Sequence, residues 1–193
     1  MMETQDLMTD AALGARVRQL RLDLGVTLDG LAERSGVSRA MISRIERGEA
    51  NPTAQLLARL CHGLGTTLSR FFAGTQAAGA PLRRHADQHV WQDPETGYRR
   101  RAVSPEGVGS PVDLVDVVFP PGGRVVFERN PFEAAYSQHL WLLEGRMRMT
   151  AGDATHDLEA GDCLFMRLDE AIVFSNPHPA PARYAIILHK AAS

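Results

Sequence analysis

The segment TLDGLAERSGVSRAMISRIERGEANPT, residues 27–53, determines the fold that the sequence predicts for the first part of the chain. After Thr27, a residue type that caps helix N-termini, leucines recur at helical spacing. Ser-Gly-Val at 35–37 predicts a tight turn. Ser38 is a second capping residue and opens a further helix that extends to Arg47. Two short helices joined by a glycine-containing turn are typical of the DNA-binding helix-turn-helix, whose second helix enters the major groove.

Three more helices are expected around this pair. Residues 12–24 carry apolar side chains at helical spacing up to a stop at Gly25. Asn-Pro-Thr at 51–53 opens a fourth, leucine-rich helix, and a short fifth one is expected over 67–72. The sequence therefore predicts a bundle of five helices.

The charge of the chain is unevenly distributed. Residues 11–80 hold nine arginines and five acidic residues, a net charge of +4. Residues 81–193 hold twelve basic and fifteen acidic residues, a net charge of −3. A basic front part and an acidic back part indicate a polyanion-binding module joined to a second module.

The run from residue 12 to about residue 72 resembles the phage-repressor-like family of DNA-binding domains, also called the XRE (xenobiotic-response-element) family. The resemblance rests on Leu-Ala at 31–32, Gly-Val-Ser at 36–38, ISRIERG at 42–48 and Asn-Pro at 51–52. One departure is Leu28, where family members often have a glutamine that contacts phosphate.

The resemblance implies roles for the exposed residues of the pair. Arg39, Ala40 and Arg44 occupy base-reading positions, where arginine can clamp guanine and a small apolar side chain can meet a thymine methyl group. Other residues of the pair lie near phosphates. The expected DNA-contacting set is Thr27, Ser38, Arg39, Ala40, Ser43, Arg44, Arg47 and Asn51. The alternative for Arg39 and Arg44 is an ordinary surface position.

Other arginines of this part are expected to be structural or solvated. Arg21 and Glu46 resemble the family's internal ion pair between the first and third helices. Arg16, Arg18 and Arg59 are most simply interpreted as residues of solvated helix faces.

Residues 74–84 have the small, polar composition of a linker, and the pattern then changes to strands. Alternation and Gly/Pro turns predict strands over 112–119, 123–127, 139–150 (split around 144–145), 153–158, 163–166, 171–174 and 184–189. The expected fold class is α+β in two domains: an all-α five-helix bundle over 11–73, the linker, and an all-β barrel of antiparallel strands over 85–193. Cys163 is expected to be a small core residue, and the arginines at 99–101 a solvated or ion-paired strand edge.

Residues 85–190 resemble the cupin (double-stranded β-helix) family in their glycine turns. These are FPPGG at 119–123, LLEGR at 142–146, LEAGD at 158–162 and Asn-Pro at 176–177. Aligned with the family's metal-binding motifs, Glu128 and Asn130 stand at two histidine positions, Gln138 at the glutamate position and Ile172 at the last histidine position. The spacer between Asn130 and Gln138 is longer than in the family.

No metal ion and no cofactor are expected, because a carboxylate and two amides do not hold a transition metal as three imidazoles do. The same residues can orient a polar ligand, with Trp141 or Met149 as apolar walls. A barrel filled by its own side chains is the alternative.

We expect a sequence-specific DNA-binding transcriptional regulator, with repression as the expected direction of control. The family layout implies a homodimer on a symmetric operator in double-stranded DNA and a small-molecule effector of unknown identity. No run of eighteen apolar residues and no signal-peptide pattern is present, so a cytoplasmic location away from membranes is expected. One alternative is a cupin isomerase or dioxygenase carrying a DNA-binding domain, although no catalytic grouping is visible. Another is a repressor whose barrel only dimerises.

Overall fold

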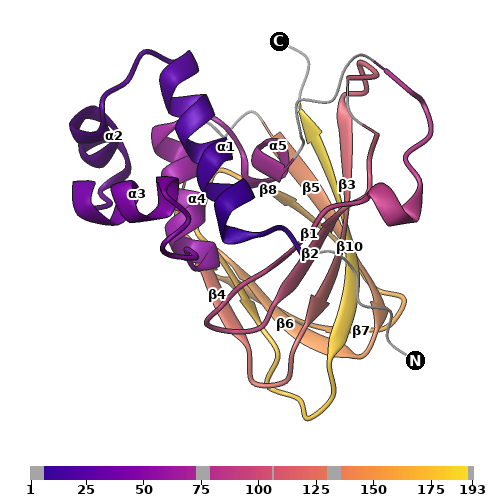
Figure 1. The fold of residues 1–193 in the computed structure, drawn as a ribbon. Helices are drawn as coiled ribbons and strands as arrows, with labels where there is room; N and C mark the ends of the chain where they lie inside the picture. Colours follow the sequence, from indigo (N-terminus) through magenta and orange to yellow (C-terminus); the bar gives the residue numbers. More distant parts are fainter. Residues whose placement is uncertain (1–6, 73–78, 106, 130–135, 191–193) are drawn as a thin grey trace.

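The computed structural model describes residues 7–72, 79–105, 107–129 and 136–190. Five helices come first, followed by a short 3-10 turn and ten strands (Figure 1). The helices are α1 (Asp10–Asp23), α2 (Leu28–Ser35), α3 (Arg39–Glu46), α4 (Ala54–Gly63) and α5 (Leu68–Phe72). The five predicted helices are therefore present, with ends within two residues of those expected.

The helix pair begins and turns where its sequence indicated. The Thr27 hydroxyl accepts a hydrogen bond from the Gly30 amide at 3.0 Å, and the Ser38 hydroxyl accepts one from the Met41 amide at 3.2 Å. Between them Gly36 has a φ of +65°, in the left-handed region that favours glycine. This conformation ends α2 abruptly and redirects the chain into α3.

The β part consists of two antiparallel sheets facing one another. The strands are β1 (Val90–Gln92), β2 (Arg99–Ala102), β3 (Val112–Phe119), β4 (Arg124–Phe127), β5 (Tyr136–Glu144), β6 (Arg146–Ala151), β7 (Ala154–Glu159), β8 (Cys163–Arg167), β9 (Ile172–Ser175) and β10 (Ala182–Lys190). One sheet has the order β1-β2-β3-β10-β5-β8 and the other β4-β9-β6-β7. Strands distant in sequence lie side by side: β10 lies between β3 and β5. The six-stranded sheet therefore depends on pairing between distant parts of the chain.

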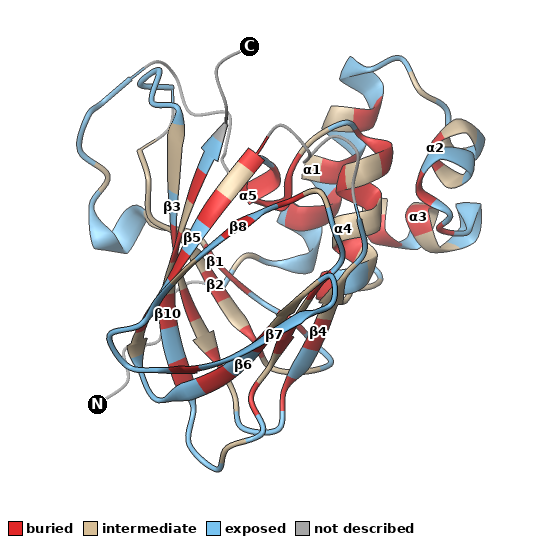
Figure 2. Ribbon diagram, turned by 180° about the vertical axis from the view of Figure 1, so that it is seen from behind, coloured by how far each residue is buried: buried red, intermediate tan, exposed pale blue. Residues whose placement is uncertain are grey.

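The strands bury alternate residues, as a sheet with one solvated face does (Figure 2). On β5, Gln138, Leu140 and Leu142 are buried. Cys163 of β8 lies opposite Trp141 of β5, on the outer face, and is exposed. The expectation of a core cysteine is therefore wrong, because position in the strand, and not residue type, determines the face.

The helices and the barrel share one continuous apolar core. Phe72 at the end of α5 contacts Trp91 on β1, with ring centroids 5.4 Å apart. The Met8 amide donates to the Val90 carbonyl at 2.8 Å, so the segment before α1 also joins the barrel. Helices α2 and α3 lie at the end of the molecule away from the sheets in both views (Figures 1 and 2). Among the described residues, no helix has the length and apolar character needed to cross a bilayer.

Candidate nucleic-acid interface and barrel cavity

Helix α3 presents a polar face to solvent and an apolar face to the bundle. Ile42 and Ile45 are fully buried, whereas Arg39, Ala40 and Arg44 are exposed. The structure thus brings the three expected base-reading residues onto one free surface. Their contacts with DNA remain predictions.

Two of the arginines on this surface are held by carboxylates. Arg39 Nε lies 3.2 Å from Asp29 Oδ1 of α2. Arg47 donates to both oxygens of Glu49, at 2.6 and 2.7 Å, and to the Ser43 hydroxyl. The hydrogen bond to Glu49 raises the pKa of Arg47, and the same bond lowers the pKa of Glu49. These carboxylates compete with a phosphate for the two guanidinium groups.

The remaining expected contacts have structural tasks in the free protein. Thr27 and Ser38 use their hydroxyls as helix caps. Asn51 is half-buried, and its amide oxygen accepts a hydrogen bond from Trp91 Nε1 at 3.4 Å. Asn51 therefore links the helices to the barrel.

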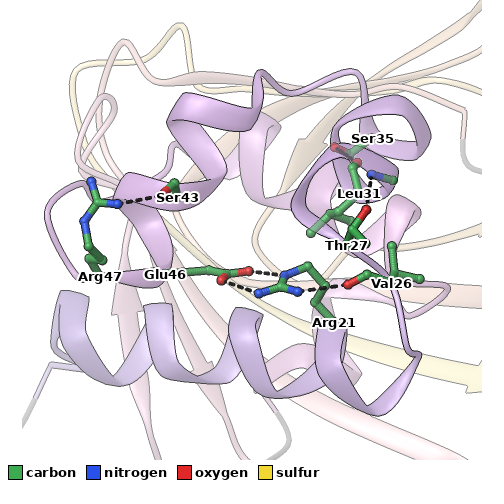
Figure 3. Close-up of polar contacts among 9 residues, drawn as sticks. Arg21, Val26, Thr27, Leu31, Ser35, Ser43, Glu46 and Arg47 are labelled. Carbon is green, nitrogen blue, oxygen red and sulfur yellow. Dashed lines mark hydrogen bonds and ion pairs between the residues drawn. The ribbon is translucent and has the colours of Figure 1, made fainter.

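The predicted pair between Arg21 and Glu46 is confirmed (Figure 3). Its two hydrogen bonds measure 2.6 and 2.7 Å, and Arg21 also donates to the Val26 carbonyl at 2.9 Å. The hydrogen bond to Glu46 raises the pKa of Arg21. The pair fixes α3 to α1, so it sets the orientation of the exposed face.

Two of the three arginines interpreted as solvated, Arg16 and Arg59, instead contact backbone carbonyls of other helices. Arg18 is exposed as expected, but Arg16 Nε lies 3.4 Å from the Phe71 carbonyl oxygen. Arg59 of α4 donates to the Ser35 carbonyl at 3.2 Å and also to the Gly36 carbonyl. The interpretation fails for Arg16 and Arg59 because other helices pack along the same faces of α1 and α4.

A cavity of about 100 Å³ lies at the end of the barrel that the helices cover. Its walls come from α4, α5 and both sheets. Glu128, Gln138 and Ile172 line it, so three of the expected ligand-contacting residues do come together. Asn130 lies outside the described residues.

The two apolar walls expected for this cavity lie elsewhere. Met149 is buried in the barrel core but does not line the cavity. Trp141 is 49% exposed and is on the outer face of β5. The expectation for Trp141 is wrong because Gln138 points inward, and a residue three positions along a strand points to the opposite face.

The sequence reasoning missed the cavity's most distinctive residue, Arg100. It is only 8% exposed and donates to the Tyr98 hydroxyl at 3.4 Å and to the Ser69 hydroxyl of α5. Arg101, its neighbour on the opposite face, lies 3.7 Å from Asp116 and is ion-paired as expected. The expectation of a solvated or ion-paired edge is wrong for Arg100, and β2 lies between β1 and β3, not at the edge of the sheet. Alternation along β2 is the signal that distinguishes the two.

The aromatic floor of the cavity is buried and uncharged. Tyr184 is 1% exposed and stacks on Phe174, with centroids 5.9 Å apart. Burial raises the pKa of Tyr184 well above its ordinary value, and the nearby charge of Arg100 acts in the opposite direction.

The donor set does not suit a metal ion. Ile172 has no ligating atom, and Gln138 donates from its amide nitrogen to the Met166 sulfur at 3.2 Å. Within the described ranges, no group of three or more His, Cys, Asp or Glu residues is placed to hold a metal.

Comparison with known proteins agrees with this architecture. Residues 12–71 match a family described as a helix-turn-helix domain. Over 183 residues the chain is 23% identical to the HTH-type transcriptional regulator SutR of Escherichia coli, covering 92% of this chain and 94% of that protein.

Two solved structures are similar to it. An HTH_3-family transcriptional regulator from Vibrio cholerae has a TM-score of 0.76 at 21% identity, covering 96% of this chain and 98% of that one. A cupin domain of an XRE-family regulator from Enterobacter cloacae has a TM-score of 0.45 at 16% identity, over 49% of this chain and 98% of that one. Residues 12–71 are a helix-turn-helix domain, and the chain as a whole is similar in sequence and in fold to helix-turn-helix transcriptional regulators.

Proposed function

We propose that this protein is a DNA-binding transcriptional regulator in which α3 is the recognition helix. The observation that carries the proposal is the exposed face of α3, with Arg39 and Arg44 directed to solvent and its apolar side locked into the bundle. The similarity to SutR over nearly the whole chain supports it. Such a role places the protein where the DNA is, in the cytoplasm.

A comparison of two arginine variants tests the assignment of α3. Arg39→Ala removes a base-reading side chain and is expected to cost about 1–3 kcal/mol at the preferred site and to relax base preference. Arg47→Ala, past the base-reading turns, is expected to weaken binding to all sequences alike. Selection of binding sites from random DNA, followed by titration at several salt concentrations, measures both effects. Equal loss of base preference in the two variants would show that the register on α3 is wrong.

We further propose that the protein acts as a homodimer on a two-fold symmetric operator. One helix-turn-helix buries little surface, and two domains on half-sites one DNA turn apart combine their contacts. The outer face of the six-stranded sheet offers a dimer surface, because Trp141, Phe165 and Leu114 are 49%, 55% and 41% exposed. We call these three residues the outer apolar patch.

The dimer is tested at this patch. Trp141→Glu is expected to convert the dimer to a monomer in sedimentation velocity and to weaken operator binding. Leu82→Glu is the matched control, because Leu82 is a 62% exposed apolar residue outside the patch. A wild-type monomer, or a Trp141→Glu variant that stays dimeric, would contradict this proposal.

A regulatory role, and not an enzymatic one, is favoured by the chemistry of the cavity. A metal-dependent cupin isomerase or dioxygenase needs imidazole ligands and usually a carboxylate on its metal. Glu128 and Ile172 stand at histidine positions and Gln138 at the glutamate position. We propose that the cavity binds a small-molecule effector without metal. Elemental analysis of protein purified without added metal tests this, and a stoichiometric transition metal would refute it.

A further inference from the structure

We propose that the cavity binds a small organic anion on Arg100, and that Arg59 transmits its binding to the recognition helix. This inference rests on the proposed regulatory function and specifies its effector site.

Arg100 is a buried charge that lacks a counter-charge among the described residues. Arg100 is 8% exposed, and its hydrogen-bond acceptors, Tyr98 and Ser69, are both neutral hydroxyls. Among the described residues, no carboxylate forms an ion pair with it. A buried guanidinium is costly unless it is paired, and its planar fork matches a carboxylate. Glu128 also lines the cavity, but it is exposed and no ion pair joins it to Arg100, so the empty space beside Arg100 can take a carboxylate.

The rest of the cavity defines the body of the ligand. One part of the wall is apolar and is formed by Phe127, Leu168, Ile172, Phe174, Ile186 and Leu188. A volume of about 100 Å³ is below the roughly 150 Å³ of an engineered protein cavity that holds benzene. The ligand class is therefore a carboxylate with a short apolar body, of at most about six heavy atoms.

The lid of the cavity belongs to the DNA-binding part. Ser69 of α5 bonds to Arg100, and residues of α4, including Arg59 and His62, complete the lining. A ligand that enters therefore contacts the helix-turn-helix domain itself and not only the barrel.

Arg59 connects the cavity to the turn before α3. Arg59 is one of the lining residues, and its guanidinium donates to the carbonyls of Ser35 and Gly36, the last residue of α2 and its cap. The contact is close, since a Cβ at Gly36 would overlap the Arg59 guanidinium. An anion in the cavity competes with these carbonyls for Arg59, so occupation loosens the turn that orients α3. DNA affinity should fall, and DNA should weaken anion binding by the same factor.

Anion binding is tested first on the full chain without DNA. The probes are the sodium salts of acetate, propionate and butyrate, with acetamide, propionamide and butyramide as neutral isosteres and chloride to match ionic strength. We expect at least one carboxylate to raise the unfolding midpoint and to give saturable heats of binding, with no effect from its amide. Arg100→Gln should abolish the effect, whereas Arg124→Gln, at an exposed arginine of β4, should retain it.

A second measurement guards against a misfolded variant. Removing an uncompensated buried charge should leave the ligand-free Arg100→Gln protein at least as stable as the wild type. A lower midpoint for that variant, equal responses to amides and carboxylates, or no response to any probe would overturn the anion site.

The coupling is tested with an operator fragment selected by the protein. The stabilising carboxylate is expected to weaken DNA binding about tenfold, within the range usual for allosteric coupling. Arg59→Met removes the group for which the anion and the carbonyls compete, so the carboxylate should still raise the unfolding midpoint, by less than in the wild type, but should no longer change DNA affinity. A variant that retains the full coupling would overturn the role of Arg59. If the protein binds a carboxylate but no DNA, the regulatory function is refuted and the anion site stands. If it binds specific DNA but responds to no carboxylate, the anion site is refuted and the regulatory function stands.

Discussion

Glu46→Gln is expected to lower the stability of the helical part by far more than a similar change in an exposed ion pair of the same geometry would. Glu46 and Arg21 are joined by hydrogen bonds of 2.6 and 2.7 Å, and their side chains are only 7% and 10% exposed. Breaking one partner of such a pair leaves a charge poorly solvated, which costs about 3–5 kcal/mol. Arg21 keeps its bond to the Val26 carbonyl, so we expect the lower end, about 3 kcal/mol.

The matched control is Asp157→Asn in the pair with Arg148. That pair has a similar two-bonded geometry, at 2.7 and 3.0 Å, but its side chains are 63% and 48% exposed. Water replaces the lost partner there, so no measurable change in the free energy of unfolding is expected.

Urea unfolding followed by circular dichroism at the helical band measures the effect, because α-helix is confined to residues 10–72 among the described residues. With a typical urea dependence of about 1–3 kcal/mol/M, the midpoint for Glu46→Gln should fall by about 1–3 M. Equal shifts for the two variants would refute the reasoning that burial, and not hydrogen-bond geometry, determines the value of these pairs.

Three further predictions concern DNA affinity, packing and pH. Asp29→Asn frees Arg39 and should raise DNA affinity about two- to fivefold in titrations at low salt, as expected from an exposed ion pair; Glu33→Gln on the same helix is the control, and no gain over it would contradict the competition. Gly14→Ala should lower the thermal midpoint despite the better helix propensity of alanine, because its Cβ would overlap the Ile45 carbonyl where α1 crosses α3; a raised midpoint would show that the helices separate freely. Because burial raises the pKa of Tyr184, the folded state keeps this proton at pH values where the unfolded chain loses it, so stability present below about pH 10 should decline above it. Tyr184→Phe should flatten that decline in urea titrations, and an unchanged alkaline slope would assign the loss to other groups.

Local chemistry made the helical part predictable from the sequence. The caps Thr27 and Ser38 and the left-handed Gly36 act within a few residues of the chain, so the helix pair and its turn could be located without the fold. The exposed face of α3 followed from helical periodicity alone.

The strands from β3 onward were predictable one at a time, but their faces were less so. The buried Gln138 and the exposed Trp141 and Cys163 depend on register, and a one-residue difference exchanges the two faces of a strand. Residue type favoured the interior for both Trp141 and Cys163, whereas the pairing of β5 with β8 places them together outside.

The sequence by itself determined the helix-turn-helix, its basic charge, the glycine turns of the barrel and the absence of histidine from the expected metal positions. Only the tertiary structure determined that α4 and α5 cover the barrel, that Arg100 is buried beneath them and that Arg59 joins the cavity to the turn before α3. Local propensity acts over a few residues, whereas these contacts join positions 23 to 31 residues apart in the chain. Such contacts form only when two separately specified surfaces pack together, and that packing depends on the shape of both.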